Sequence, residues 1–147
     1  MLSSNIDNRN EPRLSGYKKY IIKEVNGRRI AIIGYTTTDT PILTSAGKLT
    51  CLYMVYSPSH PCQVHSSIVE STGDLVFHDV VQSVRDAVQT IQRTQPSINI
   101  FIAVGHAGFD VDKKVAKEVD EIDIVVGGHS NTFLYTGLHF TFLYILR

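Results

Sequence analysis

The sequence predicts a fold of the α/β class, and three patterns along the chain support that prediction. An Asn-Gly pair separates two apolar segments at 20–25 and 28–35, apolar residues recur at helical spacing over 78–93, and apolar runs cover 98–104 and 122–126. Helical segments that alternate with short buried strands are typical of a sheet with parallel strands. The chain has 147 residues and a hydrophobic content of 43%, which is enough for one domain with its own core.

The first two strands are predicted to form a β-hairpin. Segments 20–25 and 28–35 are joined only by Asn26-Gly27, and both residue types tolerate the positive φ that a two-residue hairpin turn requires. The sequence before the hairpin, at 1–16, is polar and turn-rich, and the segment 36–41 after it is predicted to be a loop.

The segment 78–93 is predicted to be an amphipathic helix. Its apolar side chains form one stripe, made of Val80, Val81, Val84, Ala87, Val88 and Ile91. A second, shorter helix is predicted at 112–119, with Asp112 as its N-terminal cap. Because this helix lies between the apolar runs at 98–104 and 122–126, those runs are predicted to be parallel neighbours joined by a right-handed crossover.

Two of the predicted strands end in a glycine–histidine pair. Gly105-His106 follows the run at 98–104, and Gly128-His129 follows the run at 122–126. Since the carboxyl ends of parallel strands lie at the same edge of a sheet, both imidazoles are expected there. Imidazole is the commonest metal ligand, so the pair predicts a metal site. The alternative is that each histidine is structural.

Other polar residues nearby are weaker candidates. Asn131 could bind a metal through its amide oxygen or orient a phosphate, although asparagine at such a place also forms turns. Asp110 and Asp112 could offer oxygen ligands, although helix capping is expected of at least one of them. The remaining histidines and the cysteines give no ligand pattern; these are Cys51, His60, Cys62, His65, His78 and His139.

The composition argues against a nucleic-acid partner, a disulfide-rich fold and a membrane-spanning segment. The 14 basic and 14 acidic residues give a formal net charge of zero without a basic run, which argues against a nucleic-acid partner. Two cysteines do not make a disulfide framework. The start of the chain does not resemble a signal peptide, and no apolar stretch reaches the roughly 20 residues that span a bilayer. As written, the chain is expected in the cytoplasm.

The two glycine–histidine segments resemble one known family in detail. They read Gly-His-Ala-Gly-Phe-Asp-Val-Asp-Lys at 105–113 and Val-Val-Gly-Gly-His-Ser-Asn-Thr-Phe-Leu-Tyr-Thr-Gly at 125–137. Both resemble the animal ecto-5′-nucleotidases, and the second motif is highly specific for that family. Further matching segments are Ser4-Asn5-Ile6, 33–37 and Thr40-Pro41. The resemblance covers residues 1–47 and about 72–137.

That resemblance implies part of a calcineurin-like metallophosphoesterase domain, an α/β sandwich with mixed sheets that holds two metal ions, usually zinc. Such enzymes hydrolyse nucleoside 5′-monophosphates, AMP above all, to nucleoside and phosphate, and a separate C-terminal domain binds the nucleoside. His106 and His129 match metal-ligand positions, and Asn131 matches a position that faces the second metal and the phosphate. Intact family members are held at the cell surface by a lipid anchor, which has no counterpart here, or are secreted.

The residues that the family uses for catalysis have no counterpart in this chain. An Asp-x-His motif, a bridging aspartate and an Asn-His-Glu segment with the catalytic histidine all precede the matched region in the family. Two dications held close together need several anionic oxygen ligands. We therefore expect the isolated chain to be inactive and to hold at most one metal ion weakly.

Two segments do not fit the family pattern. Ser45-Ala46-Gly47 should lead almost directly into Leu75-Val76-Phe77, so 48–71 is interpreted as a foreign insertion within a domain that covers 1–137. The segment 138–147 is interpreted as an unrelated hydrophobic tail. Both resemble translated intron or the product of a faulty gene model, and the alternative is a lineage-specific loop.

Two other functions remain open at the level of sequence. One is an apyrase-type nucleotide phosphohydrolase of the same superfamily, because specificity resides in the nucleoside-binding domain. The other is a non-catalytic remnant that acts as a binding protein. The identity of the metal and the oligomeric state are not determined by the sequence.

Overall fold

The computed structural model describes residues 1–9, 11, 16–43 and 75–132. The predicted insertion at 48–71 and the predicted tail at 138–147 lie outside the described residues. Within the described part of the chain, no helix is long and apolar enough to cross a membrane.

The chain divides into two compact units. One unit is formed by Met1–Thr38 together with Asp74–Arg147, and the other is Asp39–Gly73. In the second unit, the described part contains the short helix α1 (Thr40–Leu43), which begins inside the segment predicted to be a loop. The other described helices and strands belong to the first unit, which also contains the candidate site.

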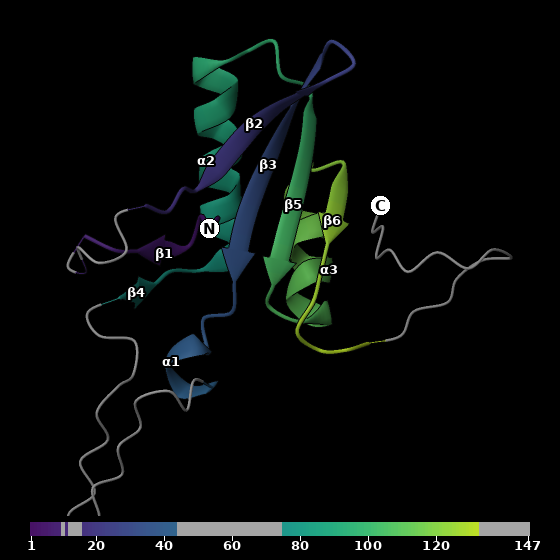
Figure 1. The fold of residues 1–147 in the computed structure, drawn as a ribbon. Helices are drawn as coiled ribbons and strands as arrows, with labels where there is room; N and C mark the ends of the chain where they lie inside the picture. The colour runs from purple at the N-terminus through teal and green to yellow at the C-terminus, as the bar shows by residue number, and fades with distance from the viewer. Residues whose placement is uncertain (10, 12–15, 44–74, 133–147) are drawn as a thin grey trace, which may run out of the picture. The chain divides into compact units, whose positions relative to one another are not determined.

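A four-stranded sheet organises the first unit. Its strand order is β2 (Tyr20–Val25), β3 (Arg28–Thr36), β5 (Ile100–His106) and β6 (Ile124–Val126). β2 runs antiparallel to β3, whereas β3, β5 and β6 run parallel to one another (Figure 1). The predicted parallel pairing of the two apolar runs is confirmed, and the carboxyl ends of β5 and β6 lie at one edge of the sheet.

β2 and β3 form the predicted hairpin. Val25 pairs with Arg28, so Asn26 and Gly27 alone make the turn. Their φ angles of 50° and 76° are both positive, as the favoured two-residue hairpin turn requires.

Two helices pack on one face of this sheet. α2 (Val80–Thr94) contacts β3, α3 (Phe109–Glu118) contacts β6, and the two helices contact each other (Figure 1). α2 begins where the Asp79 carboxylate accepts a hydrogen bond of 2.8 Å from the Gln82 N–H, which satisfies one of the free donors of the first turn.

The helices and the sheet face that they cover enclose one hydrophobic core. β3 contributes every second residue, namely Ala31, Ile33 and Tyr35, because successive side chains of a strand point to opposite faces. α2 contributes most of its predicted stripe, buried at Val80, Val84, Ala87, Val88 and Ile91. Burying each valine or isoleucine stabilises the fold by about 1.5–3 kcal/mol.

The N-terminal segment is more ordered than its polar sequence predicted. β1 (Ile6–Asp7) pairs antiparallel with β4 (Val76–Phe77), and Asn5 beside it is fully buried. The Asn5 amide donates to the carbonyls of Thr36 at 2.9 Å and His78 at 3.2 Å, and its Oδ1 accepts from the Thr36 N–H at 3.0 Å. The buried amide is tolerated because it is hydrogen-bonded.

Two predicted elements have shifted boundaries, and one predicted role is wrong. The strand predicted at 98–104 continues to His106, and the helix predicted at 112–119 already begins at Phe109. The N-cap of α3 is Gly108, so Asp112 is not the cap but lies inside the helix with an exposure of 2%. Gly108 has φ 93°, a backbone conformation that glycine adopts without a steric cost.

Candidate functional site

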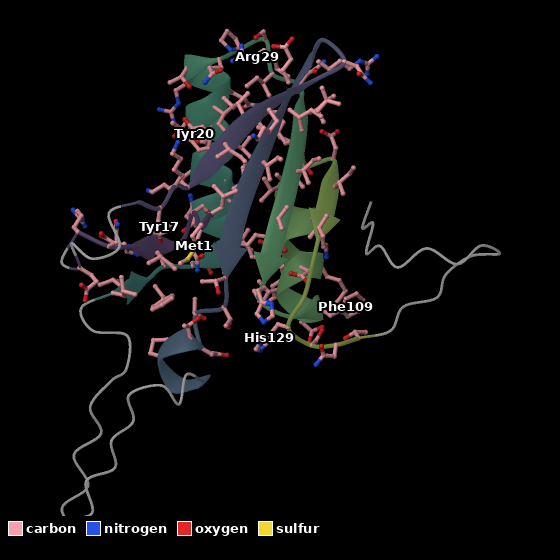
Figure 2. All side chains as sticks on the ribbon, viewed as in Figure 1. Met1, Tyr17, Tyr20, Arg29, Phe109 and His129 are labelled. Atoms are coloured by element: carbon pink, nitrogen blue, oxygen red, sulfur yellow. The ribbon has the colours of Figure 1, made fainter. Side chains whose placement is uncertain are left out.

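His106 and His129 come together at the carboxyl edge of the sheet. His106 is the last residue of β5, and His129 lies in the loop that follows β6. Their ring centroids are 5.0 Å apart and their ring planes are inclined at 74°. Both residues are exposed, and Figure 2 shows His129 beside the end of β5. The prediction that both imidazoles lie at the same edge is confirmed.

Two glycine-containing loops hold the histidines against each other. The Gly108 N–H donates a hydrogen bond of 3.1 Å to the Gly128 carbonyl, which ties the loop after β5 to the loop after β6. A Cβ on Gly128 would lie 3.2 Å from Nδ1 of His106, and a Cβ on Gly108 would lie 3.7 Å from Cδ2 of His129. A side chain at position 128 would therefore crowd the His106 ring, whereas a Cβ at position 108 would make an ordinary contact with the His129 ring.

The loop after β6 carries two unusual backbone conformations. His129 has φ 80° and Asn131 has φ 51°, both in the left-handed region. Asparagine visits that region readily, whereas histidine persists there only when the surrounding structure holds it. Ser130 helps to fix the conformation of this loop, because its Oγ accepts a hydrogen bond of 3.2 Å from the Phe109 N–H at the start of α3.

A buried carboxylate supports the same loop. Asp112 accepts a hydrogen bond of 2.6 Å from the Tyr35 hydroxyl at Oδ1, and a Cβ on Gly127 would overlap its Oδ2. Burial raises the pKa of Asp112, while the Tyr35 hydroxyl, the Gly128 backbone and the nearby histidines oppose that rise. Burial, together with the bond to Asp112, raises the pKa of the Tyr35 hydroxyl, which therefore stays a proton donor at neutral pH.

The amino-acid sequence of this chain is similar to those of known 5′-nucleotidases. The chain is 36% identical to a 5′-nucleotidase of Diplobatis ommata over 140 residues, and 34% identical to a 5′-nucleotidase of Homo sapiens over 126 residues. These matches cover 93% and 85% of this chain.

The chain belongs to the 5′-nucleotidase family. It spans about a fifth of the length of these curated relatives, since the matches cover 20% and 17% of them. No family model matches the chain.

Solved structures share the fold of this 5′-nucleotidase-family chain. The 5′-nucleotidase precursor from Thermus thermophilus superposes with a TM-score of 0.68 at 28% identity, over 94% of this chain and 22% of that one. The NAD nucleotidase of Haemophilus influenzae gives a TM-score of 0.62 at 26% identity, over 93% and 22% of the respective chains. The family resemblance and the metallophosphoesterase-type α/β fold with mixed sheets are thus confirmed.

Asp110 and Asn131 are the remaining candidate residues of this 5′-nucleotidase-family chain. Asp110 forms an ion pair of 2.8 Å with Lys113 on the surface of α3, and its hydrogen bond to that ammonium lowers the pKa of Asp110. Asn131 is exposed, and its role toward a metal or phosphate stays a prediction. Among the described residues, no group of three or more His, Cys, Asp or Glu side chains could hold a metal ion. Within the described ranges, a third side chain of these types does not join His106 and His129.

A groove of about 830 Å³ lies elsewhere in the first unit. Its lining includes Asp7, Tyr20 and His78, but neither His106 nor His129. His78 is exposed, and its Nε2 lies 3.8 Å from the Asp7 carboxylate. The groove is thus separate from the histidine pair.

The hydrogen bond between Tyr35 and Asp112 was not predicted from the sequence. Asp112 precedes Val115 and Val119 by three and seven positions, and both valines are fully buried, so the helical spacing already placed Asp112 on the inner face of α3. Nothing local indicated its partner, which lies 77 positions earlier in the chain.

Proposed function

We propose that this chain is part of an enzyme that hydrolyses nucleoside 5′-monophosphates, AMP foremost, to nucleoside and phosphate. Relatives named 5′-nucleotidase, at 34% and 36% identity, support the reaction class. Within the structure, one observation carries the proposal: His106 and His129 approach each other to 5.0 Å at the carboxyl edge of the sheet.

The spacing of the two imidazoles fits joint coordination of one metal ion. On a tetrahedral zinc with Zn–N distances of about 2.0–2.1 Å, the centroids of two imidazole ligands lie about 5 Å apart. The separation of 5.0 Å between the rings of His106 and His129 agrees with that arrangement. We propose zinc as the metal, with Asn131 facing a second metal ion and the substrate phosphate through its amide oxygen.

When bound, two such ions would polarise the phosphate and supply an activated water at neutral pH. In this chain, His106 and His129 would hold one ion, and Asn131 would orient the phosphate. The described residues contain no larger group of ligands. We therefore propose that the isolated chain holds at most one ion weakly and is inactive, with the catalytic residues supplied by other parts of the enzyme.

The family resemblance supports three further proposals about the intact protein. Its partner is a nucleoside monophosphate and not a nucleic acid. It acts at the cell surface, held by a lipid anchor, or outside the cell. Residues 48–71 are a foreign insertion in a partial metallophosphoesterase domain that covers 1–137, and 138–147 are an unrelated tail.

Zinc titration of the full 147-residue chain tests the metal assignment. We expect His106→Ala and His129→Ala each to weaken zinc binding at least about tenfold relative to the parent chain, because each removes a ligand. His78→Ala is the matched control, since it removes an exposed imidazole that lies outside the pair. Equal zinc affinity in the double variant His106→Ala/His129→Ala and the parent chain would contradict the assignment.

The substrate is tested separately on the intact protein expressed from its complete transcript. Phosphate release from AMP with zinc present is the expected result. Absence of release from AMP, in a preparation that binds zinc, would contradict the proposed reaction.

A further inference from the structure

We propose that Asp112 and Tyr35 are positioning residues that hold His106 and His129 in place for a shared metal ion. The inference rests on the proposed function, because it concerns the same metal site. This buried pair contacts the backbone at Gly105, directly before His106, and at Gly127, two residues before His129.

Asp112 is attached to the loop that carries His129. A Cβ on Gly127 would overlap the Asp112 carboxylate, so Asp112 packs directly on the backbone two residues before that histidine. Since Asp112 is 2% exposed and belongs to the first turns of α3, the helix fixes where this loop can lie.

Tyr35 lies against the strand that carries His106. It is paired in register with Gly105, and a Cβ on Gly105 would overlap the Tyr35 ring. The ring therefore covers the residue directly before His106, and the Tyr35 hydroxyl donates a hydrogen bond of 2.6 Å to Asp112. One chain of contacts thus runs from β5 through Tyr35 and Asp112 to the loop after β6.

The histidines depend on such outside support. Neither ring of His106 or His129 forms a hydrogen bond with another described residue, so the backbone sets where the rings lie. His129 also has φ 80°, a left-handed conformation that is unfavourable for histidine and needs support from its surroundings. The packing of Asp112 on Gly127 supports the loop two residues before His129.

Two isosteric variants of the full chain test the inference. Tyr35→Phe keeps the ring over Gly105 and removes the hydroxyl, whereas Asp112→Asn keeps the volume but removes the charge and replaces one acceptor oxygen with an NH2 donor. Tyr17→Phe is the matched control, because it removes a tyrosine hydroxyl that donates a bond of 2.9 Å to the Ile6 carbonyl, away from the histidines. The measurements are NMR cross-relaxation between the two imidazole rings in the metal-free chain, and zinc affinity.

We expect both site variants to lose the contacts between the rings and to weaken zinc binding by about 10–100-fold, the usual effect of removing a group that orients metal ligands. The amide signals of the β2–β3 hairpin should stay in place, and Tyr17→Phe should behave like the parent chain. If the site variants acted only through a general loss of packing, the hairpin signals would shift as well, and Tyr17→Phe would show similar effects.

Retained contacts between the rings with unchanged zinc affinity, in either site variant that keeps the hairpin signals, would overturn the inference. If Tyr35→Phe loses the hairpin signals, the ring contacts and zinc affinity of Asp112→Asn test the inference, because that substitution does not change the side-chain volume. The contacts between the rings are read without metal, so they do not depend on the proposed function. If the proposed function is wrong, zinc affinity will instead be unchanged by His106→Ala and His129→Ala.

Discussion

The Tyr35 hydroxyl donates a hydrogen bond of 2.6 Å to the Asp112 carboxylate and so joins two buried residues that lie 77 positions apart in the sequence. A hydrogen bond to a charged group contributes about 1.5–3 kcal/mol, and a buried group left without its partner costs a similar amount. The contact couples the end of β3 to the start of α3, next to the loops that carry the histidines.

Gly105→Ala should destabilise the first unit by about 1–3 kcal/mol, because the added Cβ would overlap the Tyr35 ring and push it away from Asp112. Urea denaturation of the full chain measures the loss. Gly16→Ala is the control, since no atom lies within 4 Å of the position of its Cβ. Equal free energies of unfolding in the two variants would contradict the expected overlap.

Asn5→Ala should lower the free energy of unfolding by about 2–4 kcal/mol, because it leaves backbone groups of Thr36 and His78 without their partner. Those groups exchange hydrogen bonds of 2.9–3.2 Å with the Asn5 amide. Denaturant unfolding followed by circular dichroism measures the change. A midpoint equal to that of the parent chain would mean that the N-terminal segment is not docked as described.

Arg9→Ala should change how stability depends on acid. The side-chain hydrogen bond from Arg9 lowers the pKa of Asp7 from 3.8 to about 2. Because the folded pKa lies below the unfolded value, the native state binds fewer protons, and the stabilisation is present above pH 3.8 and is lost as the pH falls toward 2. The variant should return the pKa of Asp7 toward 3.8, measured by NMR titration of its carboxyl. An unaltered Asp7 titration would argue against the ion pair.

The isolated 147-residue chain should release no phosphate above background from AMP or from a generic aryl phosphate, with zinc supplied. The reason is that its described residues contain no group of three or more metal-binding side chains. A colorimetric phosphate assay checks this. Turnover that disappears in His129→Ala would show that the chain builds a working site alone.

Deleting residues 48–71 should leave the first unit as stable as before or slightly more so. Shortening a flexible loop by half lowers its closure cost by only about 0.6 kcal/mol. The deletion falls within the separate unit Asp39–Gly73. Thermal unfolding of the shortened chain is the measurement, and loss of the folded amide spectrum would show that these residues belong to the core.

Features with a local signal could be predicted from the sequence. Asn26-Gly27 specifies its turn through the φ preferences of two adjacent residues, and the hairpin forms around it. The parallel pairing of β5 and β6 follows from a helix lying between two apolar runs. That pairing was sufficient to bring His106 and His129 to one edge.

Features set by distant polar partners could not be predicted. Asp112 has the residue type of a helix cap, and only the approach of Tyr35 from β3 makes its burial tolerable. Asn5 has the residue type of a turn, and its burial depends on carbonyls of Thr36 and His78 that lie 31 and 73 positions away. In both cases the sequence gives the polar group but not its partner.

The strand order has a consequence for how the protein folds. β5, α3 and β6 follow one another along the chain, whereas β3 pairs with β5 only after a long intervening segment. Contacts between residues close in sequence cost less chain entropy and form faster than distant ones. We therefore expect His106 and His129 to come together early in folding, within a β5–α3–β6 nucleus. Tyr35 should reach Asp112 only when β3 docks, so the histidine pair forms before the contact that stabilises it.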